Sequence, residues 1–294
     1  MHRPTPTFPE HLNALYRGFR FDRSLAQDPL GEVRPFATDR WHAEVAGVFA
    51  STLAIGNTTS IRRAFADATD RSGGDLTRVV ERMVRPGADP AFDGFRHRWI
   101  RGEHLGYLAY RLRAIERSTG SLQAVFAEGL AGPHGFAGGV DALARALRGS
   151  GSGGGEPPPP PGYVPLFPSP LEKNRSACKR LTLFVRWMVR PEYPDLGVWS
   201  GIAPSVLRIP LDQHVYWIAY HLGLTHRRSR NWTTVEEVTR SLRAIDPTDP
   251  VKYDFVLCHT GISGDCPKHR DLTVCGACVV RPDCRLWRGR RGVP

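Results

Sequence analysis

The 294-residue sequence has no apolar run long enough to cross a bilayer, and its first residues show no signal-peptide pattern. We therefore expect a cytoplasmic protein with no membrane partner. The sequence also lacks strand-like alternation of apolar and polar residues over a useful length, which argues against a β-sheet core. Apolar residues recur at helical spacing instead, and this pattern predicts an all-α fold. In a cytoplasmic protein, clustered cysteines indicate metal ligands rather than disulfides.

Acidic residues are scarce relative to basic ones. The chain has 29 Asp and Glu against 40 Lys and Arg, a net charge of +11, and most of the cations are arginine. Arginine binds phosphate through planar, bidentate contacts. This balance indicates a polyanionic partner, nucleic acid first and a membrane surface second. The alternative is a basic, solvated surface that reflects a general preference for arginine over lysine.

Helical patterns fill the chain on both sides of one low-complexity segment. Residues 40–53 predict a mostly buried helix that ends at Gly56-Asn57, and Thr58 or Thr59 is expected to cap the next helix. Similar patterns recur over residues 75–148 and 231–245. Residues 149–162 are rich in Gly and Pro and cannot pack a core, so we expect an exposed linker or an inserted loop there.

The stretch around Asp212 gives the sharpest local prediction. Pro210 ends the apolar segment before it, because proline cannot continue a helix from upstream. Asp212 then occupies the position of an N-cap before residues 215–222, where apolar side chains recur at helical spacing. It either caps this helix and does nothing more, or it also presents a carboxylate at the mouth of a buried site.

Lys179 lies where a second helix is expected to begin. Apolar residues at helical spacing predict a helix up to Val189, and Ser176 is its expected N-cap. The partial positive charge at the start of a helix disfavours a protonated lysine there. Lys179 is therefore a candidate nucleophile, with a phosphate-binding surface lysine as the equally weighted alternative.

Four cysteines follow the spacing Cys266-x8-Cys275-x2-Cys278-x5-Cys284. A Cys-x2-Cys pair lets two thiolates converge on one metal centre. Both zinc and a [4Fe–4S] cluster accept four cysteines, and the short, unequal gaps suit the cluster better than a two-knuckle zinc ribbon. The other two cysteines, at positions 178 and 258, are expected to be small buried residues.

These features together resemble the helix-hairpin-helix DNA glycosylase superfamily, in which endonuclease III carries an iron–sulfur cluster. Lys179, the segment Pro210-Leu211-Asp212-Gln213-His214-Val215 and the C-terminal four-Cys loop follow the order of the family's motifs. The similarity covers residues 168–287 and, more weakly, residues 40–63. Residues 176–181 and 249–255 look more specifically like a bacterial branch described as a domain of unknown function.

The resemblance implies a DNA base-excision glycosylase, with or without AP-lyase activity, that flips a damaged base out of duplex DNA, and an oxidised base is one candidate lesion. Asp212 would stabilise the cationic sugar, and Lys179 would form a Schiff base with it. The cluster would be structural. A monomer near the nucleoid is implied, with a discontinuous cluster-bearing domain (residues 1–40 and 210–294) and a helical barrel (residues 41–209). The expected DNA-binding residues are Lys173, Arg175, Arg180, His214, Lys268 and Arg270.

The sequence departs from the family at three places, one of which is the longer gap after the first cysteine of the C-terminal loop. Leu171-Glu172-Lys173-Asn174-Arg175 replaces the usual Leu-Pro-Gly-Val-Gly hairpin, and the separation of Lys179 from Asp212 is longer, as in archaeal 8-oxoguanine glycosylases. Two other functions therefore stay open. One is a non-catalytic DNA-binding or damage-sensing module on the same fold, and the other is a zinc or iron–sulfur protein that acts in redox chemistry or binds RNA.

Overall fold

The expected all-α fold is confirmed. The structure is a computed structural model that describes residues 7–149, 156–173 and 176–288, and these residues form fourteen α-helices. The only strands in the described ranges are β1 (Arg96–His97) and β2 (Ile100–Arg101), which pair as a short antiparallel hairpin. No helix among these residues is long and apolar enough to cross a membrane.

The helices vary from one to five turns. The α-helices are α1 (Phe8–Arg17), α2 (Phe21–Leu25), α3 (Pro29–Val33), α4 (Arg40–Leu53), α5 (Thr58–Arg71), α6 (Leu76–Arg82), α7 (Gly102–Thr119), α8 (Leu122–Ala131), α9 (Gly135–Arg148), α10 (Lys179–Val189), α11 (Gln213–His221), α12 (Trp232–Arg243), α13 (Asp254–Ile262) and α14 (Leu272–Gly276). The short 3₁₀ helices are η1 (Arg34–Phe36), η2 (Pro90–Phe92), η3 (Val164–Leu166), η4 (Pro204–Val206) and η5 (Arg281–Asp283).

Polar side chains at the helix starts explain most of these boundaries. Asp39 accepts a hydrogen bond from the backbone N–H of His42 and begins α4 at the expected residue. Asn57 caps α5, so the expectation of a threonine cap was wrong. Ser176 does not cap α10, because that helix begins three residues later and Cys178 occupies its N-cap position.

Helix α4 is the centre of the fold. Every residue from Ala43 to Leu53 is buried, and the helix packs against α3, α5, α6 and α10. Its one buried acid, Glu44, accepts hydrogen bonds from the backbone N–H groups of Leu122 and Gln123 at the start of α8. An anion is stable at that position because the free N–H groups of a helix start point toward it. Burial still raises the pKa of Glu44.

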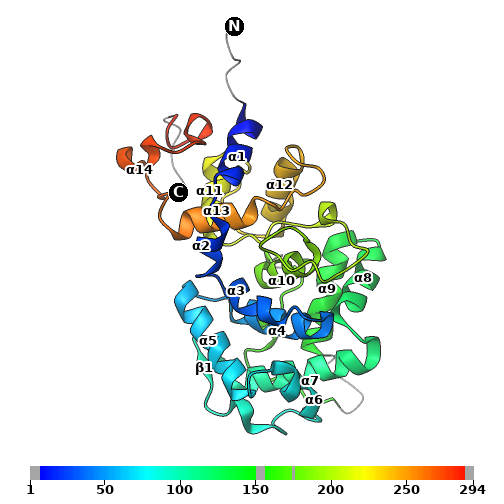
Figure 1. The fold of residues 1–294 in the computed structure, drawn as a ribbon. Coiled ribbons are helices and arrows are strands. Elements are labelled where there is room, and N and C mark those ends of the chain that lie inside the picture. Colours follow the sequence, from blue (N-terminus) through cyan, green and yellow to red (C-terminus); the bar gives the residue numbers. More distant parts are fainter. Residues whose placement is uncertain (1–6, 150–155, 174–175, 289–294) are drawn as a thin grey trace.

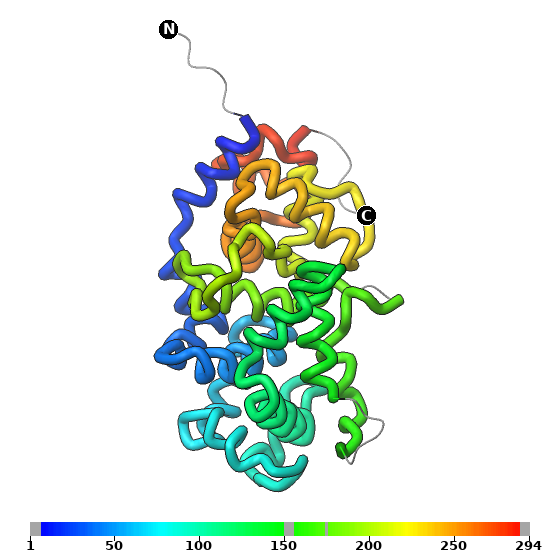
Figure 2. The backbone as a smooth tube through the Cα atoms, turned by 90° about the vertical axis from the view of Figure 1, so that its right-hand side faces the viewer, coloured from blue at the N-terminus to red at the C-terminus, as the bar shows by residue number. Residues whose placement is uncertain are grey.

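The first and last described helices lie in one half of the molecule, with α1 beside the segments that carry α11, α13 and α14 (Figures 1 and 2). His11 contacts Asp283 at 2.7 Å, and the Tyr253 hydroxyl donates to Asn13 at 2.9 Å. Helices α4–α9 form the other half. Helix α3 packs on α4 and α5.

A buried ionic network holds α10 in place. Arg186 pairs with Asp195 at 2.8 Å and also with Asp254, and Arg190 pairs with Asp195 at 2.5 Å and with Asp249 at 2.8 Å. The two guanidinium groups face three carboxylates, so the fully ionised network carries one excess negative charge. The segment between α10 and α11, which lengthens the Lys179–Asp212 separation, is thus tied to both α10 and the start of α13.

Candidate active site and cysteine loop

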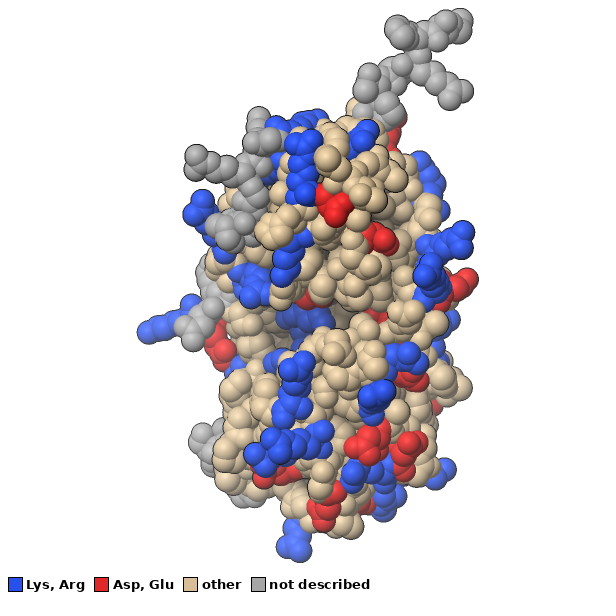
Figure 3. All heavy atoms as spheres, turned by 90° about the vertical axis from the view of Figure 1, so that its left-hand side faces the viewer, with Lys and Arg blue, Asp and Glu red and all other residues tan. Residues whose placement is uncertain are grey.

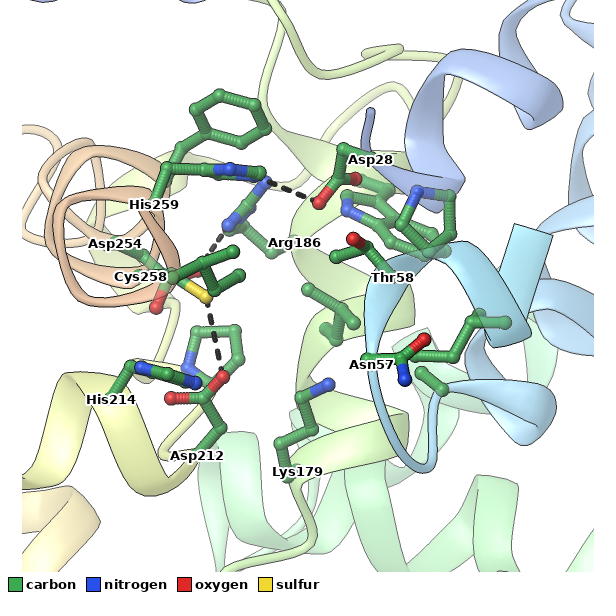
Figure 4. A pocket seen from close by; sticks show the side chains of 18 of the residues that line it. Asp28, Asn57, Thr58, Lys179, Arg186, Asp212, His214, Asp254, Cys258 and His259 are labelled. Carbon is green, nitrogen blue, oxygen red and sulfur yellow. Dashed lines mark hydrogen bonds and ion pairs between the residues drawn. The ribbon is translucent and has the colours of Figure 1, made fainter. Parts of the chain in front are cut away.

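Lys179 is the first residue of α10, and its amine points into a cavity (Figure 4). The residue before it, Cys178, has a φ of 50°, which is a left-handed conformation that non-glycine residues rarely adopt. The Cys178 thiol is buried, as expected, and donates to the carbonyl of Pro168 at 3.2 Å. Strained backbone of this kind is concentrated at functional sites, and here it directs the chain into the turn from which Lys179 projects.

Asp212 is the N-cap of α11, as predicted, and it also lines the cavity. One carboxylate oxygen accepts a hydrogen bond from the backbone N–H of Val215 at 2.8 Å. The other accepts from the thiol of Cys258 at 3.2 Å. The two readings of Asp212 are therefore compatible, because one oxygen closes the helix and the other belongs to the cavity.

The cavity has a volume of about 330 Å³ and lies between the two halves of the molecule. Its walls come from the starts of α3 and α5, from α10 and α11, and from one face of α13. Figure 4 shows Lys179 and Asp212 at one end, Asn57 and Thr58 on the α5 side, and His259 with Asp28 at the other end. A second hollow of about 300 Å³ shares Lys179 and Asp212, so these two side chains stand where the hollows meet.

The α13 wall supplies functional groups that the sequence analysis missed. The ring of His259 contacts the Asp28 carboxylate at 2.9 Å and lies over the Phe255 ring, with centroids 4.2 Å apart. Asp254 has one carboxylate oxygen without a hydrogen-bond partner among the described residues. Burial raises the pKa of Asp254 to about 7, against the effect of Arg186 and with a further contribution from Asp212. Asp254 can thus hold a proton at the cavity wall near neutral pH.

Cys258 was expected to be an ordinary buried residue, but it is partly exposed within the cavity wall. Burial, followed by the charge of Asp212, raises the pKa of its thiol well above the usual value. The thiol therefore stays protonated, and its S–H group donates a hydrogen bond to Asp212. The signal that could have found this wall is the spacing of residues 254, 258 and 262, which places them on one face of a helix.

His214 lines the cavity beside Asp212 and packs edge-on against Trp217, with ring centroids 4.8 Å apart. Gly261 makes room for it, because a Cβ atom at that position would lie 2.7 Å from the His214 Cβ. The amine of Lys268 lies 4.5 Å from the centroid of the Trp217 ring. Two of the expected DNA-binding residues, His214 and Lys268, thus flank one tryptophan.

The other expected DNA-binding residues have different surroundings. The Arg180 guanidinium donates to the carbonyl of Leu166 at 2.9 and 2.7 Å, and burial lowers its pKa to about 10. Much of its hydrogen-bonding capacity is therefore used within the protein. Lys173 is exposed in the turn before α10, and Arg270 lies 4.4 Å above the Trp287 ring. Arg175 lies outside the described residues.

The four cysteines of the C-terminal loop line one small cavity. Burial raises the pKa of Cys266 to about 12, and the charges of the other three sulfurs add to this effect. Within the described ranges, no three His, Cys, Asp or Glu side chains are grouped closely enough to hold a single metal ion. Four cysteine thiols around one cavity are nevertheless the donor set that both a [4Fe–4S] cluster and structural zinc accept, so the residue types fit either group.

The cysteine loop is attached to the C-terminal end of α11. The backbone N–H of Arg285 donates to the carbonyl of His221 at 2.8 Å, and its guanidinium donates to the carbonyls of Tyr220 and Thr225 at 2.9 and 3.2 Å. These bonds satisfy carbonyl groups that a helix end leaves free. The loop therefore fixes one end of α11, and Asp212 caps the other.

One of three comparisons with known proteins found a match. The sequence model of a family described as "Protein of unknown function (DUF2400)" matches residues 28–263. That range includes Lys179, Asp212 and all of the cavity-lining residues but ends before the four-Cys loop. Searches of curated proteins and of solved structures found no match.

Proposed function

Because this chain belongs to the family described as Protein of unknown function (DUF2400), its activity has to be inferred from its site, and we propose that it is a DNA glycosylase that removes a damaged base from duplex DNA. The observation that carries this proposal is the placement of the Lys179 amine and the Asp212 carboxylate, from the starts of two helices, at one end of a cavity of about 330 Å³. That volume is in the range of small-molecule sites, as a flipped base requires.

Base removal breaks the bond between the base and C1′ of the sugar, and the bonding electrons leave with the base. Positive charge develops on the sugar, and a fixed carboxylate stabilises that charge most in the transition state. Asp212 is suited to this role because its orientation is held from both sides, by Val215 N–H and by the Cys258 thiol. Preorganisation of this kind means that the carboxylate need not reorient as the charge forms.

Strand cleavage would follow by attack of the Lys179 amine on C1′. The amine adds to the C1′ carbon that the base has left, and cleavage of the ring C1′–O4′ bond then gives the Schiff base. Loss of a C2′ proton eliminates the 3′ phosphate, and addition of water to C1′ releases the lysine. The sequence has four lysines, all of them in the described ranges. Lys179 is the one that lines the cavity, whereas Lys252 pairs with Asp246 at 2.5 Å and Lys268 lies against Trp217.

Duplex DNA would lie across the face shown in Figure 3, where Lys and Arg side chains gather around a hollow midway along the molecule. Lys179 lines both cavities, and Arg180 and Arg230 line the second. Phosphate contacts from such residues would position the duplex, and the cavity would receive one extruded nucleotide. The +11 net charge of the chain supports a polyanionic partner of this kind.

The cysteine loop would hold a [4Fe–4S] cluster through Cys266, Cys275, Cys278 and Cys284, with zinc as the alternative. When bound, the cluster would supply no bond-breaking chemistry but would fix the loop. The loop's own residues would then do two things. Arg285 would hold the end of α11, and Lys268 and Arg270 would lie near the DNA backbone.

A panel of duplexes with single lesions tests the proposal. Oxidised, alkylated, deaminated and mismatched bases are incubated with the protein, and released bases and abasic sites are measured. Excision of at least one lesion, lost in Asp212→Asn, is the expected result. Binding to duplexes without any excision across the panel would contradict the proposal and favour the non-catalytic DNA-binding module. Metal-containing protein that binds no duplex would favour the redox or RNA-binding alternative.

A further inference from the structure

His221 is a buried histidine whose ring makes no hydrogen bond within the described part of the chain. Its side chain is about 1% exposed, and neither ring nitrogen has a hydrogen-bond partner among the described residues. A neutral imidazole carries one N–H donor and one acceptor, and buried groups of this kind nearly always find partners. An unpaired imidazole inside the protein therefore indicates that a partner is missing from the polypeptide itself.

The ring lines the same cavity as the four cysteines. His221 is the last residue of α11, and its carbonyl is held by the N–H of Arg285, the residue next to Cys284. Two other polar residues around this cavity are already bonded elsewhere. Thr260 donates to the carbonyl of Val256, and Arg281 donates to the carbonyl of Gly276. The sulfur-lined cavity is the side of the ring on which a partner is still required.

We propose that His221 donates its ring N–H to a sulfur atom of the [4Fe–4S] cluster held by the four cysteines, and that this hydrogen bond sets the reduction potential of the cluster. The inference rests on the iron–sulfur assignment made under the proposed function. Hydrogen bonds to cluster sulfurs are among the factors that set such potentials. The reduced cluster carries one more negative charge, so a donor stabilises it more than the oxidised cluster and raises the potential.

Two variants separate a hydrogen-bond donor from a space-filling residue. His221→Leu removes the donor, and His221→Gln keeps an N–H group on a side chain of similar reach. Anaerobically purified proteins are analysed for iron and sulfide, and the one-electron potential is measured by spectroscopic titration with dithionite as the electron donor. Circular dichroism checks that each variant is folded. His134→Leu, at an exposed position on the opposite half of the molecule, is the matched control.

Wild type, both His221 variants and the control should carry equal iron. His221→Leu should shift the reduction equilibrium by about tenfold toward the oxidised form, which is about 59 mV for a one-electron couple, and His221→Gln should recover part of that shift. Equal reduction potentials in wild type and His221→Leu would overturn the inference about His221 and leave the cluster assignment standing. Loss of iron from both His221 variants would also overturn it, because His221 would then be a ligand. Wild type without iron would overturn the cluster assignment together with the inference, while the excision assay would still test the glycosylase separately.

Discussion

Two substitutions of Asp212 separate its role as a helix cap from its role as a charged group in the cavity, because its two carboxylate oxygens have different partners. One oxygen accepts the Val215 N–H at 2.8 Å as a helix cap, and the other faces the Cys258 thiol and the cavity. Asn is as good an N-cap as Asp, whereas Ala forfeits about 1 kcal/mol. Asp212→Asn therefore removes the charge and keeps the cap, and Asp212→Ala removes both.

The expected magnitudes differ enough to be distinguished. Removing one preorganised group that stabilises transition-state charge lowers the rate by about 10²- to 10³-fold, so both variants should lose excision to that extent. Asp212→Ala should in addition unfold about 2 °C lower, since about 1 kcal/mol shifts Tm by that much in a chain of this size. The assay is single-turnover excision on the duplex found in the lesion panel, beside thermal unfolding.

Asp39→Ala is the control. Asp39 caps α4 through the His42 N–H, in the same way as Asp212 caps α11, but it lies away from the cavity. Asp39→Ala should lose stability and keep excision. Full excision by Asp212→Asn, with a stability loss only in Asp212→Ala, would refute the reasoning and leave Asp212 as a cap.

Three further outcomes are expected. Affinity for duplex DNA should fall steeply with salt, and Lys268→Gln should lower the slope of log affinity against log salt by about one; a flat salt titration would exclude a phosphate-binding surface. Cys278→Ser should abolish bound iron while Cys258→Ser keeps it, and stoichiometric zinc in anaerobically purified wild type would reject the cluster. The pKa of Asp254 is raised from 3.8 to about 7, so the native state binds the additional proton between these values. As pH rises through that window, wild type should lose stability relative to Asp254→Asn, and parallel stability curves for the two proteins would show that Asp254 does not titrate there.

The helical fold and the positions of Lys179 and Asp212 followed from the sequence because they depend on local signals. Apolar spacing predicted α4 from residue 40 to residue 53, and the proline–aspartate pattern predicted the cap of α11. The start of α10 was misplaced because Ser176 is a favourable cap locally. The left-handed backbone at Cys178, which moves the start to Lys179, has no sequence signature in a non-glycine residue.

The cavity wall formed by α13 did not follow from the sequence. Asp28 and His259 are 231 positions apart, and their contact depends on how the chain ends pack on the rest. Cys258 was interpreted by residue type alone, and only the placement of α13 against α11 shows that its thiol faces Asp212. The resemblance to glycosylases supplied roles for two residues, whereas the partners that hold those residues in place come from tertiary contacts.

Borohydride trapping of the protein on DNA that already carries an abasic site tests the central claim most directly, because the experiment does not require knowing which lesion the protein removes. Wild type, Lys179→Gln, Lys173→Gln and Lys268→Gln are incubated with such a duplex and sodium borohydride, and covalent protein–DNA complexes are counted and mapped by mass spectrometry. The account predicts a complex in wild type, in Lys173→Gln and in Lys268→Gln, attached at Lys179, and no complex in Lys179→Gln. A complex that persists in Lys179→Gln, or one that never forms in wild type, would contradict the assignment of Lys179 as the nucleophile.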